Sequence, residues 1–281
     1  MERNIYSLQA LEKINREWSA TEKMPALFLG HGSPMNAIEE NEFVQGFRDT
    51  ATNLPRPRAI LVVSAHWETR GTFVTAMEQP RTIHDFGGFP PELYAVEYPA
   101  PGSPELALLT QSIVDSAAVQ LDDYQWGLDH GAWSVVKHLY PKADVPVIQM
   151  SIDYSQPAQY HYTLAKALNA LRYKGILVVG SGNMVHNLRA LAWQHLDEPG
   201  FAYDWALEAS EKMKKAIVNG DHQTLIDFRA QGAAFDKAIP TPEHYLPLLY
   251  TLALQEKNEA LRLFNDKPLG GSLTMTSLQI G

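Results

Sequence analysis

Five of the ten histidines in this chain lie at turns bounded by glycine, serine or proline, where they could bind a metal ion. They are His31, His66, His130, His186 and His244. Neutral imidazole is the commonest metal ligand near physiological pH. Because the chain has no cysteine, any metal would depend on His, Asp or Glu. The set suits Zn(II), Fe(II) or a related ion, and composition does not choose among them.

Three of these histidines follow apolar runs of strand length. Residues 26–29, 59–65 and 175–180 lead to His31, His66 and His186 respectively. Ligands of open α/β sheets bind at the carboxyl ends of the strands, so we predict that these three histidines converge at one sheet edge. Two glycines flank His31, which lets a metal or a substrate come close to the backbone there.

The other histidines give a weaker signal. His138, His161, His195 and His222 lie in helical or polar contexts, so we expect them to be surface residues or to have satisfied partners. His84 is intermediate, because its loop is unusual but its surroundings have no metal-like spacing.

A catalytic serine is the main alternative that the residues themselves offer. Ser33 and Ser64 lie near His31 and His66, but neither stands in the G-x-S-x-G turn of a hydrolase nucleophile. Ser181, between two glycines, also lacks that spacing. The same turn could bind a phosphate at a strand-to-helix junction, although no P-loop lysine follows it. We therefore favour a metal site over serine hydrolysis.

The elements that must position these residues indicate an α/β fold. Further strands are predicted over residues 72–77, 145–151 and 271–280, and helices over residues 39–50, 104–118, 132–139, 158–172, 204–217, 223–229 and 246–254. Residues 78–104 form a long irregular stretch, and such stretches are often functional. Strand, helix and strand follow one another over residues 145–180, which favours a right-handed, largely parallel arrangement. We expect one domain with a central, mostly parallel or mixed sheet that is flanked by helices.

Composition excludes several classes of protein. The net charge of −9 argues against a nucleic-acid partner, whose phosphates call for a basic surface. No apolar run has the eighteen or so residues of a membrane span, and residues 1–23 carry many charges and lack the apolar centre of a signal peptide. We therefore expect a cytoplasmic protein without a membrane or nucleic-acid partner. The sequence does not determine its oligomeric state.

Seven motifs together resemble the 4,5-DOPA extradiol dioxygenase family, which belongs to the class III extradiol ring-cleaving dioxygenases. They are GHGSPM at 30–35, SAHWE at 64–68, TIHDFGGFP at 82–90, YPAPGSP at 98–104, DHGAW at 129–133, GSGNMVHNL at 180–188 and PTPEHYLPL at 240–248. The resemblance runs in order from Pro25 to the carboxyl terminus. It implies a catalytic domain over residues 24–281, preceded by a leader over residues 1–23 that is helical or frayed.

The resemblance also implies roles for individual residues. His31 and His66 match the first two ligands of a non-haem metal at the strand carboxyl edge, and His244 matches the third. His186 matches a histidine against the metal, either a further ligand or the acid/base of the reaction. His130 matches a histidine that contacts substrate or oxygen. Since the third ligand in the wider superfamily is usually a glutamate, Glu243 competes with His244 for that position, and we favour His244.

The implied reaction is the insertion of O2 into a catechol such as DOPA, which opens the ring beside its two hydroxyls and gives a semialdehyde. Fe(II) is the expected working metal, and Zn(II) is expected as an ion that binds on isolation. The loops at residues 84–91 and 94–101 could form apolar walls around the ring.

Three other functions are alternatives to ring cleavage. A tetrapyrrole metal chelatase also has GHGS after a strand, but that motif does not account for SAHWE, DHGAW or PTPEH. A non-catalytic binding protein of the same superfamily would keep the pocket without the redox chemistry. Zinc hydrolysis is the third, because zinc suits the same ligands.

Overall fold

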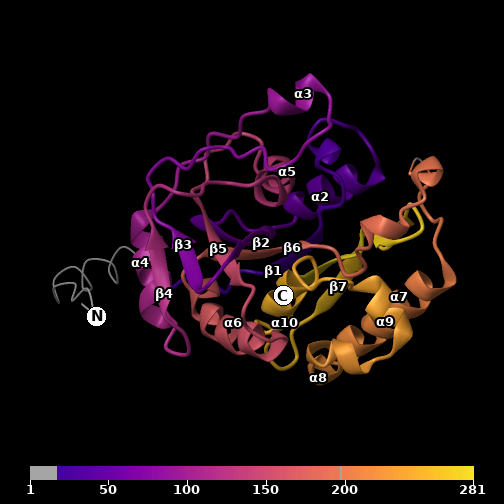
Figure 1. Cartoon of the computed structure of the whole chain (residues 1–281). Helices are drawn as coiled ribbons and strands as arrows, with labels where there is room; N and C mark the ends of the chain where they lie inside the picture. Colours follow the sequence, from indigo (N-terminus) through magenta and orange to yellow (C-terminus); the bar gives the residue numbers. More distant parts are fainter. Residues whose placement is uncertain (1–17, 197) are drawn as a thin grey trace.

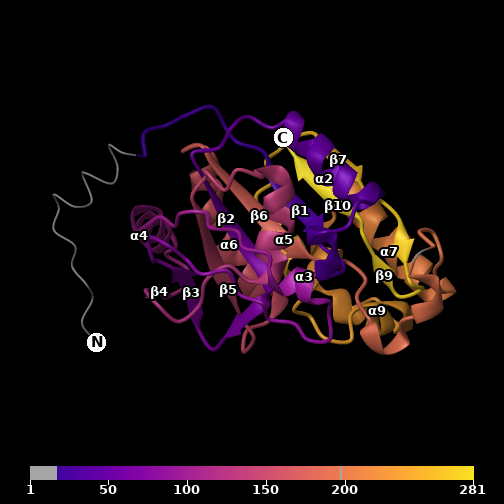
Figure 2. The same cartoon turned by 90° about the horizontal axis from the view of Figure 1, so that it is seen from above.

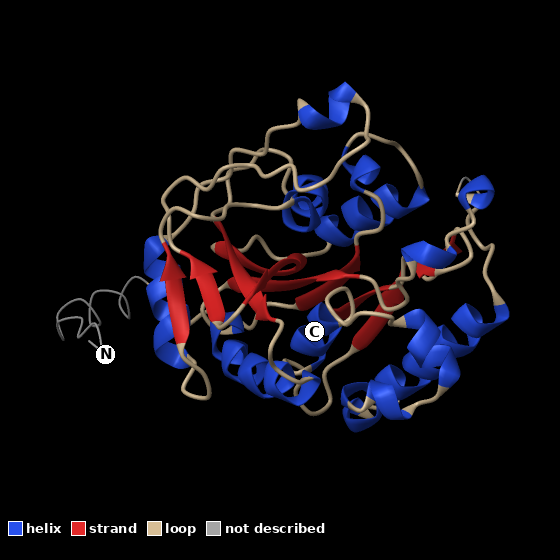
Figure 3. Ribbon diagram, in the orientation of Figure 1, coloured by secondary structure: helices blue, strands red, loops and turns tan. Residues whose placement is uncertain are grey.

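In the computed structural model, which describes residues 18–196 and 198–281, eight strands form one mixed sheet (Figures 1 and 3). Their order across the sheet is β4 (Val119–Asp122), β3 (Thr72–Thr75), β5 (Val147–Asp153), β2 (Ala59–Thr69), β6 (Ile176–Gly182), β1 (Ala26–Gly30), β10 (Ser277–Ile280) and β7 (Leu261–Phe264). The strands β8 (Pro268–Leu269) and β9 (Leu273–Thr274) form a separate small pair.

The four central strands, β5, β2, β6 and β1, run parallel to one another. Antiparallel pairs flank them, because β3 opposes β5 on one side and β10 opposes β1 on the other. The carboxyl ends of the parallel strands therefore meet along one edge. The prediction of an α/β fold with a mostly parallel or mixed sheet is confirmed.

Helices cover both faces of this sheet (Figures 1 and 2). Alternate residues of β1 divide between the two layers, as the pleat of a strand requires: Leu27 and Leu29 join one apolar core and Ala26 and Phe28 the other. The first core packs against α2 (Glu42–Thr52) and α5 (His130–Leu139). The second packs against α4 (Pro104–Ile113), α6 (Ala158–Arg172), α7 (Asp204–Val218) and α10 (Leu246–Leu252). Among residues 18–196 and 198–281, no helix has both the length and the apolar character that crossing a membrane requires.

Short elements complete the chain. They are the helices α3 (Pro91–Tyr94), α8 (His222–Ile226) and α9 (Ala233–Ala238), and the 3-10 turns η1 (Pro34–Ala37), η2 (Leu188–Ala190), η3 (Trp193–His195) and η4 (Phe228–Ala230). The sequence pattern does not predict β4, β7 or α9, since each has only four to six residues and too few repeats of a period to recognise. Helix α2 begins three residues later than predicted, because the Asn41 side chain accepts the amide protons of Phe43 and Val44 and so caps the helix there.

A buried arginine joins the two ends of the fold at the amino edge of the sheet. Arg172 has no exposed surface, and its guanidinium pairs with Glu259 at 2.6 Å. It also donates to the carbonyl oxygens of Met24, just before β1, and of Ile280, at the end of β10. The leader predicted over residues 1–23 lies, for residues 1–17, outside the described residues. Trp18 is buried under the guanidinium of Arg58, which lies 4.8 Å from its ring.

Candidate metal centre

The five histidines singled out from the sequence lie together at the carboxyl edge of the parallel strands. The ring of His31 has its centroid 5.0 Å from that of His66 and 5.3 Å from that of His244. The ring of His130 lies 3.9 Å from that of His66, and the rings of His186 and His244 stack at 3.5 Å. Residues distant in sequence thus form one imidazole cluster.

His31 owes its position to the glycines beside it. Gly30 ends β1 against the backbone of Met275, where an added Cβ would lie 2.6 Å from the carbonyl oxygen. Gly32 turns the chain with a φ of +62°, a conformation that side chains disfavour. Asn36 then donates to the carbonyl oxygen of His31 at 2.9 Å. The chain leaves the strand abruptly and presents His31 at the sheet edge.

The sequence pattern predicted His66 at the end of its strand. The structure places it inside the strand instead. Strand β2 continues to Thr69, but its pairing with β5 shifts register between Val63 and Glu68. Within this irregularity Ser64 accepts the backbone N–H of His66 at 3.2 Å and donates to Asp129 at 2.7 Å. A register shift re-aims the side chains around it, which allows β2 to contribute a ligand without ending.

His130 is the first residue of α5 and not part of a loop. The helix begins there because the carboxylate of Asp129 accepts the amide proton of Ala132. Gly131 permits the contact between this helix and β2, since an added Cβ would lie 2.4 Å from Ser64 Oγ and 2.8 Å from the ring of His66. The N-terminus of α5 therefore faces the cluster.

His186 and His244 are held by backbone contacts that join their two segments. The backbone N–H of His186 donates to the carbonyl oxygen of Ala238 at 2.8 Å. The backbone N–H of Asn183 donates to the carbonyl oxygen of His244 at 2.8 Å. The two imidazole planes are inclined by only 7°. In the described part of the chain, neither ring nitrogen of His186 has a hydrogen-bond partner, so both remain available.

In four of the five rings, Nδ1 faces an oxygen atom. His31 Nδ1 lies 3.0 Å from Ser181 Oγ, and His244 Nδ1 lies 3.2 Å from a carboxylate oxygen of Glu243. Asp85 Oδ2 lies 3.0 Å from His130 Nδ1 and 3.5 Å from His66 Nδ1. The hydrogen bonds of His31 and His244 favour a proton on Nδ1 and a lone pair on Nε2. The contacts of Asp85 with His66 and His130 lack the alignment of a hydrogen bond and act through charge alone.

For His31, the hydrogen bonds of Ser181 require the ring proton to be on Nδ1. The single hydroxyl proton of Ser181 is donated to the carbonyl oxygen of Gly131. Ser181 Oγ must therefore accept a proton from His31 Nδ1, which leaves a lone pair on His31 Nε2. That nitrogen lies 3.2 Å from His66 Nε2. If His66 carries its proton on Nε2, it donates a hydrogen bond to His31 Nε2, and if it carries the proton on Nδ1, both Nε2 lone pairs are free to bind one cation.

The spacing fits one ion. Two nitrogens that each lie about 2.1 Å from a metal and 3.2 Å from each other subtend an angle of about 100° at it, between octahedral and tetrahedral values. A set of neutral imidazoles suits Zn(II), Fe(II) and related ions. The donor set and its geometry are therefore compatible with a metal ion.

Burial keeps these imidazoles neutral. It lowers the pKa of His31 and of His244 well below 6.5, and the neighbouring histidines lower both further. Burial lowers the pKa of His66 to about 3 and that of His186 to about 4. At neutral pH the four rings are neutral, each with one N–H and one lone pair, which is the form that binds a metal.

Two residues around the cluster are not identifiable as its partners from the sequence pattern. Asp85 lies in the long stretch before α3, where its only signal is its place in the TIHDFGGFP motif. Ser181 stands out as a possible nucleophile, whereas the structure shows it in contact with His31 Nδ1. Both act through hydrogen-bonding atoms that only the folded chain brings near a histidine.

The remaining histidines have partners elsewhere, as expected for His138, His161, His195 and His222. His138 contacts the carbonyl oxygen of Asn36, His161 the hydroxyl of Tyr250, His222 the hydroxyl of Tyr162, His195 the carboxylate of Glu198 and His84 the carbonyl oxygen of Val96. None of these contacts reaches the cluster.

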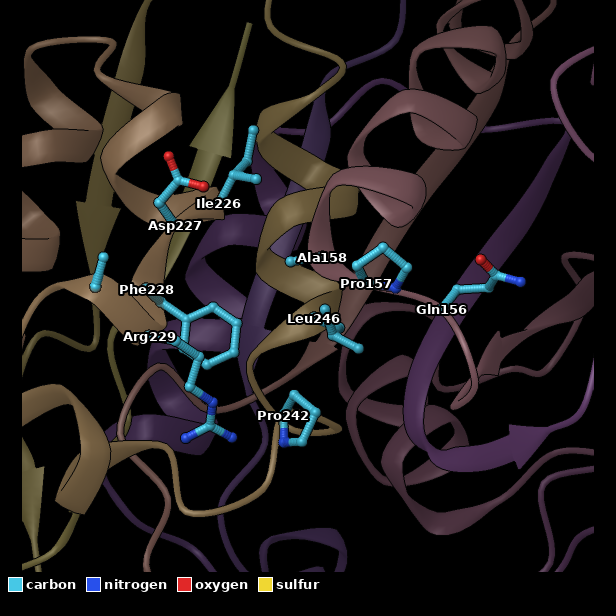
Figure 4. A pocket seen from close by; sticks show the side chains of 10 residues that line it. Gln156, Pro157, Ala158, Ile226, Asp227, Phe228, Arg229, Pro242 and Leu246 are labelled. Carbon is cyan, nitrogen blue, oxygen red and sulfur yellow. The ribbon is translucent and has the colours of Figure 1, made fainter.

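A cavity of about 430 Å³ lies between α6, α8 and the start of α10 (Figure 4). Phe228, Pro157 and Leu246 line its apolar wall, and the side chain of Arg229 extends beside Pro242. The Arg229 guanidinium donates to the carbonyl oxygen of Ile239 at 2.8 Å. None of the five histidines lines this cavity, so it is separate from the candidate metal centre.

Comparison with known proteins gives consistent matches. Residues 25–269 match the family described as the catalytic LigB subunit of aromatic ring-opening dioxygenase. A 4,5-DOPA dioxygenase extradiol of Escherichia coli (strain K12) is 48% identical over 263 residues, which cover 92% of this chain and 95% of that protein. A 4,5-DOPA dioxygenase extradiol of Beta vulgaris is 34% identical over 89% of this chain and 94% of its own length.

A solved structure has the same fold. The crystal structure of the uncharacterized protein JW3007 from Escherichia coli K12 superposes with a TM-score of 0.80 at 42% identity, covering 92% of this chain and 100% of that one.

Proposed function

The chain belongs to the family of the catalytic LigB subunit of aromatic ring-opening dioxygenases, and from that premise we propose that it is a metal-dependent extradiol dioxygenase that cleaves a catechol with O2. The observation that supports a metal is the convergence of buried imidazoles, in which His31 Nε2 and His66 Nε2 lie 3.2 Å apart and the ligand nitrogens of His31, His66 and His130 lie within 4.8 Å of one another. The proposed substrate class is a DOPA-like catechol, in keeping with the names of the relatives.

The proposed ligands are His31, His66 and His244, and the proposed working ion is Fe(II). Glu243 competes with His244 for the third position, but its carboxylate lies 3.2 Å from His244 Nδ1. A carboxylate in that position orients a ligating histidine and raises its basicity. The contact supports His244 as the ligand and Glu243 as its positioning residue.

His186 is better placed as a proton carrier than as a fourth ligand. An imidazole lone pair lies in the plane of its ring, and the planes of His186 and His244 are nearly parallel with centroids 3.5 Å apart. One ion cannot lie in both planes. Burial lowers the pKa of His186 to about 4, so the ring is neutral at about pH 7 and has a lone pair to which a catechol hydroxyl can donate a hydrogen bond.

When bound, Fe(II) would supply a single centre at which a catecholate and O2 are both activated. The protein residues then orient the ring and handle its protons. His130, whose ring centroid lies 3.9 Å from that of His66, supports His186 in this role. The ring of Phe86 meets that of His130 edge-on at 5.5 Å, and Phe86 also contacts Phe89 and Tyr94. These aromatic side chains provide an apolar wall for a catechol.

Anaerobic reconstitution with Fe(II), followed by L-DOPA or another catechol and air, tests the proposal. We expect oxygen consumption and a yellow semialdehyde that absorbs in the visible. If no catechol of a broad panel causes oxygen uptake, the dioxygenase proposal fails. Catechol binding without oxygen uptake would identify a non-catalytic binding protein, and insertion of Co(II) into a porphyrinoid would identify a chelatase.

The ligand assignment has its own test. His31→Ala should abolish metal binding, because it removes one of the two Nε2 atoms that face each other. His130→Ala should leave metal binding mostly intact, because His130 is proposed as a substrate-side residue. Metal content after dialysis measures both, and a fully metallated His31→Ala protein would overturn the assignment.

A further inference from the structure

One carboxylate contacts the histidine cluster without a role in the mechanism above. Asp85 accepts the backbone N–H of His130 through Oδ1 at 2.9 Å, and its Oδ2 lies 3.0 Å from His130 Nδ1. The same Oδ2 lies 3.5 Å from His66 Nδ1. Only 16% of the Asp85 side chain is exposed. This carboxylate therefore touches both the backbone and the ring of His130.

The segment that carries Asp85 is fixed to the segment that carries His130. Ile83 N–H donates to the carbonyl oxygen of Leu128 at 2.7 Å, and Leu128 N–H donates to that of Arg81 at 2.8 Å. Trp133 Nε1 also donates to the carbonyl oxygen of Ile83 at 2.8 Å. These bonds lie just before Asp85 in its segment and on both sides of His130 in the other, so they hold the two segments together beside the contact.

The neighbouring carboxylate cannot serve the same purpose. Asp129 has no exposed surface and accepts hydrogen bonds from Ser64, Gln149 and Ala132. Its oxygens are occupied in capping α5 and holding β2. Among the described residues, Asp85 is thus the carboxylate in contact with His130 Nδ1.

We propose that Asp85 is the positioning residue that holds the proton of His130 on Nδ1 and directs His130 Nε2 toward the bound substrate. This inference rests on the proposed dioxygenase function, in which His130 supports proton transfer. A neutral imidazole carries one ring proton, and the negative charge of an oxygen 3.0 Å from Nδ1 favours the proton on that nitrogen, although the N–H is not aligned with the oxygen as a hydrogen bond. The ring is further held between His66 and Phe86, whose centroids lie 3.9 and 5.5 Å away.

The substitution Asp85→Asn tests the proposal with little change in shape. The Asn oxygen can still accept the backbone N–H of His130, which then places the amide NH2 against Nδ1. An NH2 group is a donor, so it favours the lone pair on Nδ1 and the proton on Nε2. The tautomer of His130 is measured in the Zn(II)-loaded protein by long-range ¹⁵N–¹H correlation spectra, with His130→Gln identifying its signals.

We expect the Nδ1–H tautomer in the unmodified protein and the Nε2–H tautomer in Asp85→Asn. In the Fe(II) protein, the same substitution should lower kcat by about 10- to 100-fold and change KM by less than about threefold. Asp122→Asn is the matched control, because Asp122 also accepts backbone N–H groups, from Tyr124, Gln125 and Trp126, but its carboxylate bonds to no histidine.

Two results would overturn the proposal: an Nε2–H tautomer for His130 in the unmodified protein, or an Asp85→Asn protein whose tautomer and kcat match those of Asp122→Asn. The spectra require no turnover. A protein that is inactive on every catechol but shows the expected change of tautomer would refute the proposed function and leave the role of Asp85 standing.

Discussion

Replacing Ser181 by alanine tests whether a hydroxyl outside the ligand set controls metal affinity. Ser181 Oγ accepts the Nδ1 proton of His31 and donates its own proton to the carbonyl oxygen of Gly131. Without the Ser181 hydroxyl, His31 Nδ1 has no acceptor that keeps the ring proton on that nitrogen. The ring could then protonate on Nε2, the nitrogen that faces His66. Metal binding would have to displace that proton or reorient the ring.

The magnitude follows from the two contacts. A residue that orients a metal-binding histidine is worth about 10- to 100-fold in affinity, or about 1.4–2.8 kcal/mol. Two buried groups also lose their partner, and each such loss costs about 1–3 kcal/mol. We expect the free energy of unfolding of the metal-free protein to fall by about 2–6 kcal/mol. Since native domains have about 5–15 kcal/mol, Ser181→Ala should remain folded over most of that range.

Competition with a chelator of known affinity measures the Zn(II) dissociation constant, and urea unfolding of the metal-free protein measures stability. Ser134→Ala is the matched control. Ser134 is another buried serine of this layer, 1% exposed, but its hydroxyl has no hydrogen-bond partner. Removing it should leave affinity unchanged and stability unchanged or slightly higher. If Ser181→Ala binds Zn(II) as tightly as Ser134→Ala, the tautomer argument for His31 is wrong.

Two further predictions concern other histidines. Glu243→Gln should retain stoichiometric metal with about 10- to 100-fold weaker affinity, whereas His244→Ala should lose the metal. Metal analysis after dialysis distinguishes the two variants. If Glu243→Gln loses the metal and His244→Ala retains it, Glu243 is the ligand. Burial lowers the pKa of His161 to about 4 from a usual 6.5, so the unfolded chain binds more protons between these values. Stability should therefore be full above pH 6.5 and fall by about 3 kcal/mol toward pH 4. His161→Asn should flatten this part of the profile of unfolding free energy against pH, and an unchanged profile would contradict the assignment.

The sequence was most informative where an apolar strand pattern leads directly to a histidine. The run into His31 predicts a strand and the flanking glycines predict a tight turn, and both are present as β1 and the turn at Gly32. The parallel centre of the sheet follows from similar runs before His66 and His186. Strand ends of a parallel sheet share an edge, so the convergence of these residues is also predictable from their order along the chain.

Other features depend on contacts between distant segments. Asp85 reaches His130 because residues 81–83 bond to the backbone near Leu128, and no local pattern encodes that pairing. The register shift that places His66 within β2 arises from pairing with β5 and from the contact between Ser64 and Asp129. The stacking of His186 on His244 likewise joins two segments far apart in the chain. Such features follow from tertiary packing and require the folded structure.

The Arg172 contacts have a practical consequence for handling the protein. They hold the segments before β1 and at the end of β10 close together at the amino edge of the sheet, whereas the histidine cluster lies at the carboxyl edge. A surface tether or a fusion partner attached after Gly281 would therefore sit away from the site and leave it accessible to small molecules. Because Met24 and Ile280 both bond to Arg172, a short linker could join the start of β1 to the end of β10 in a circular permutant that is opened at an exposed turn.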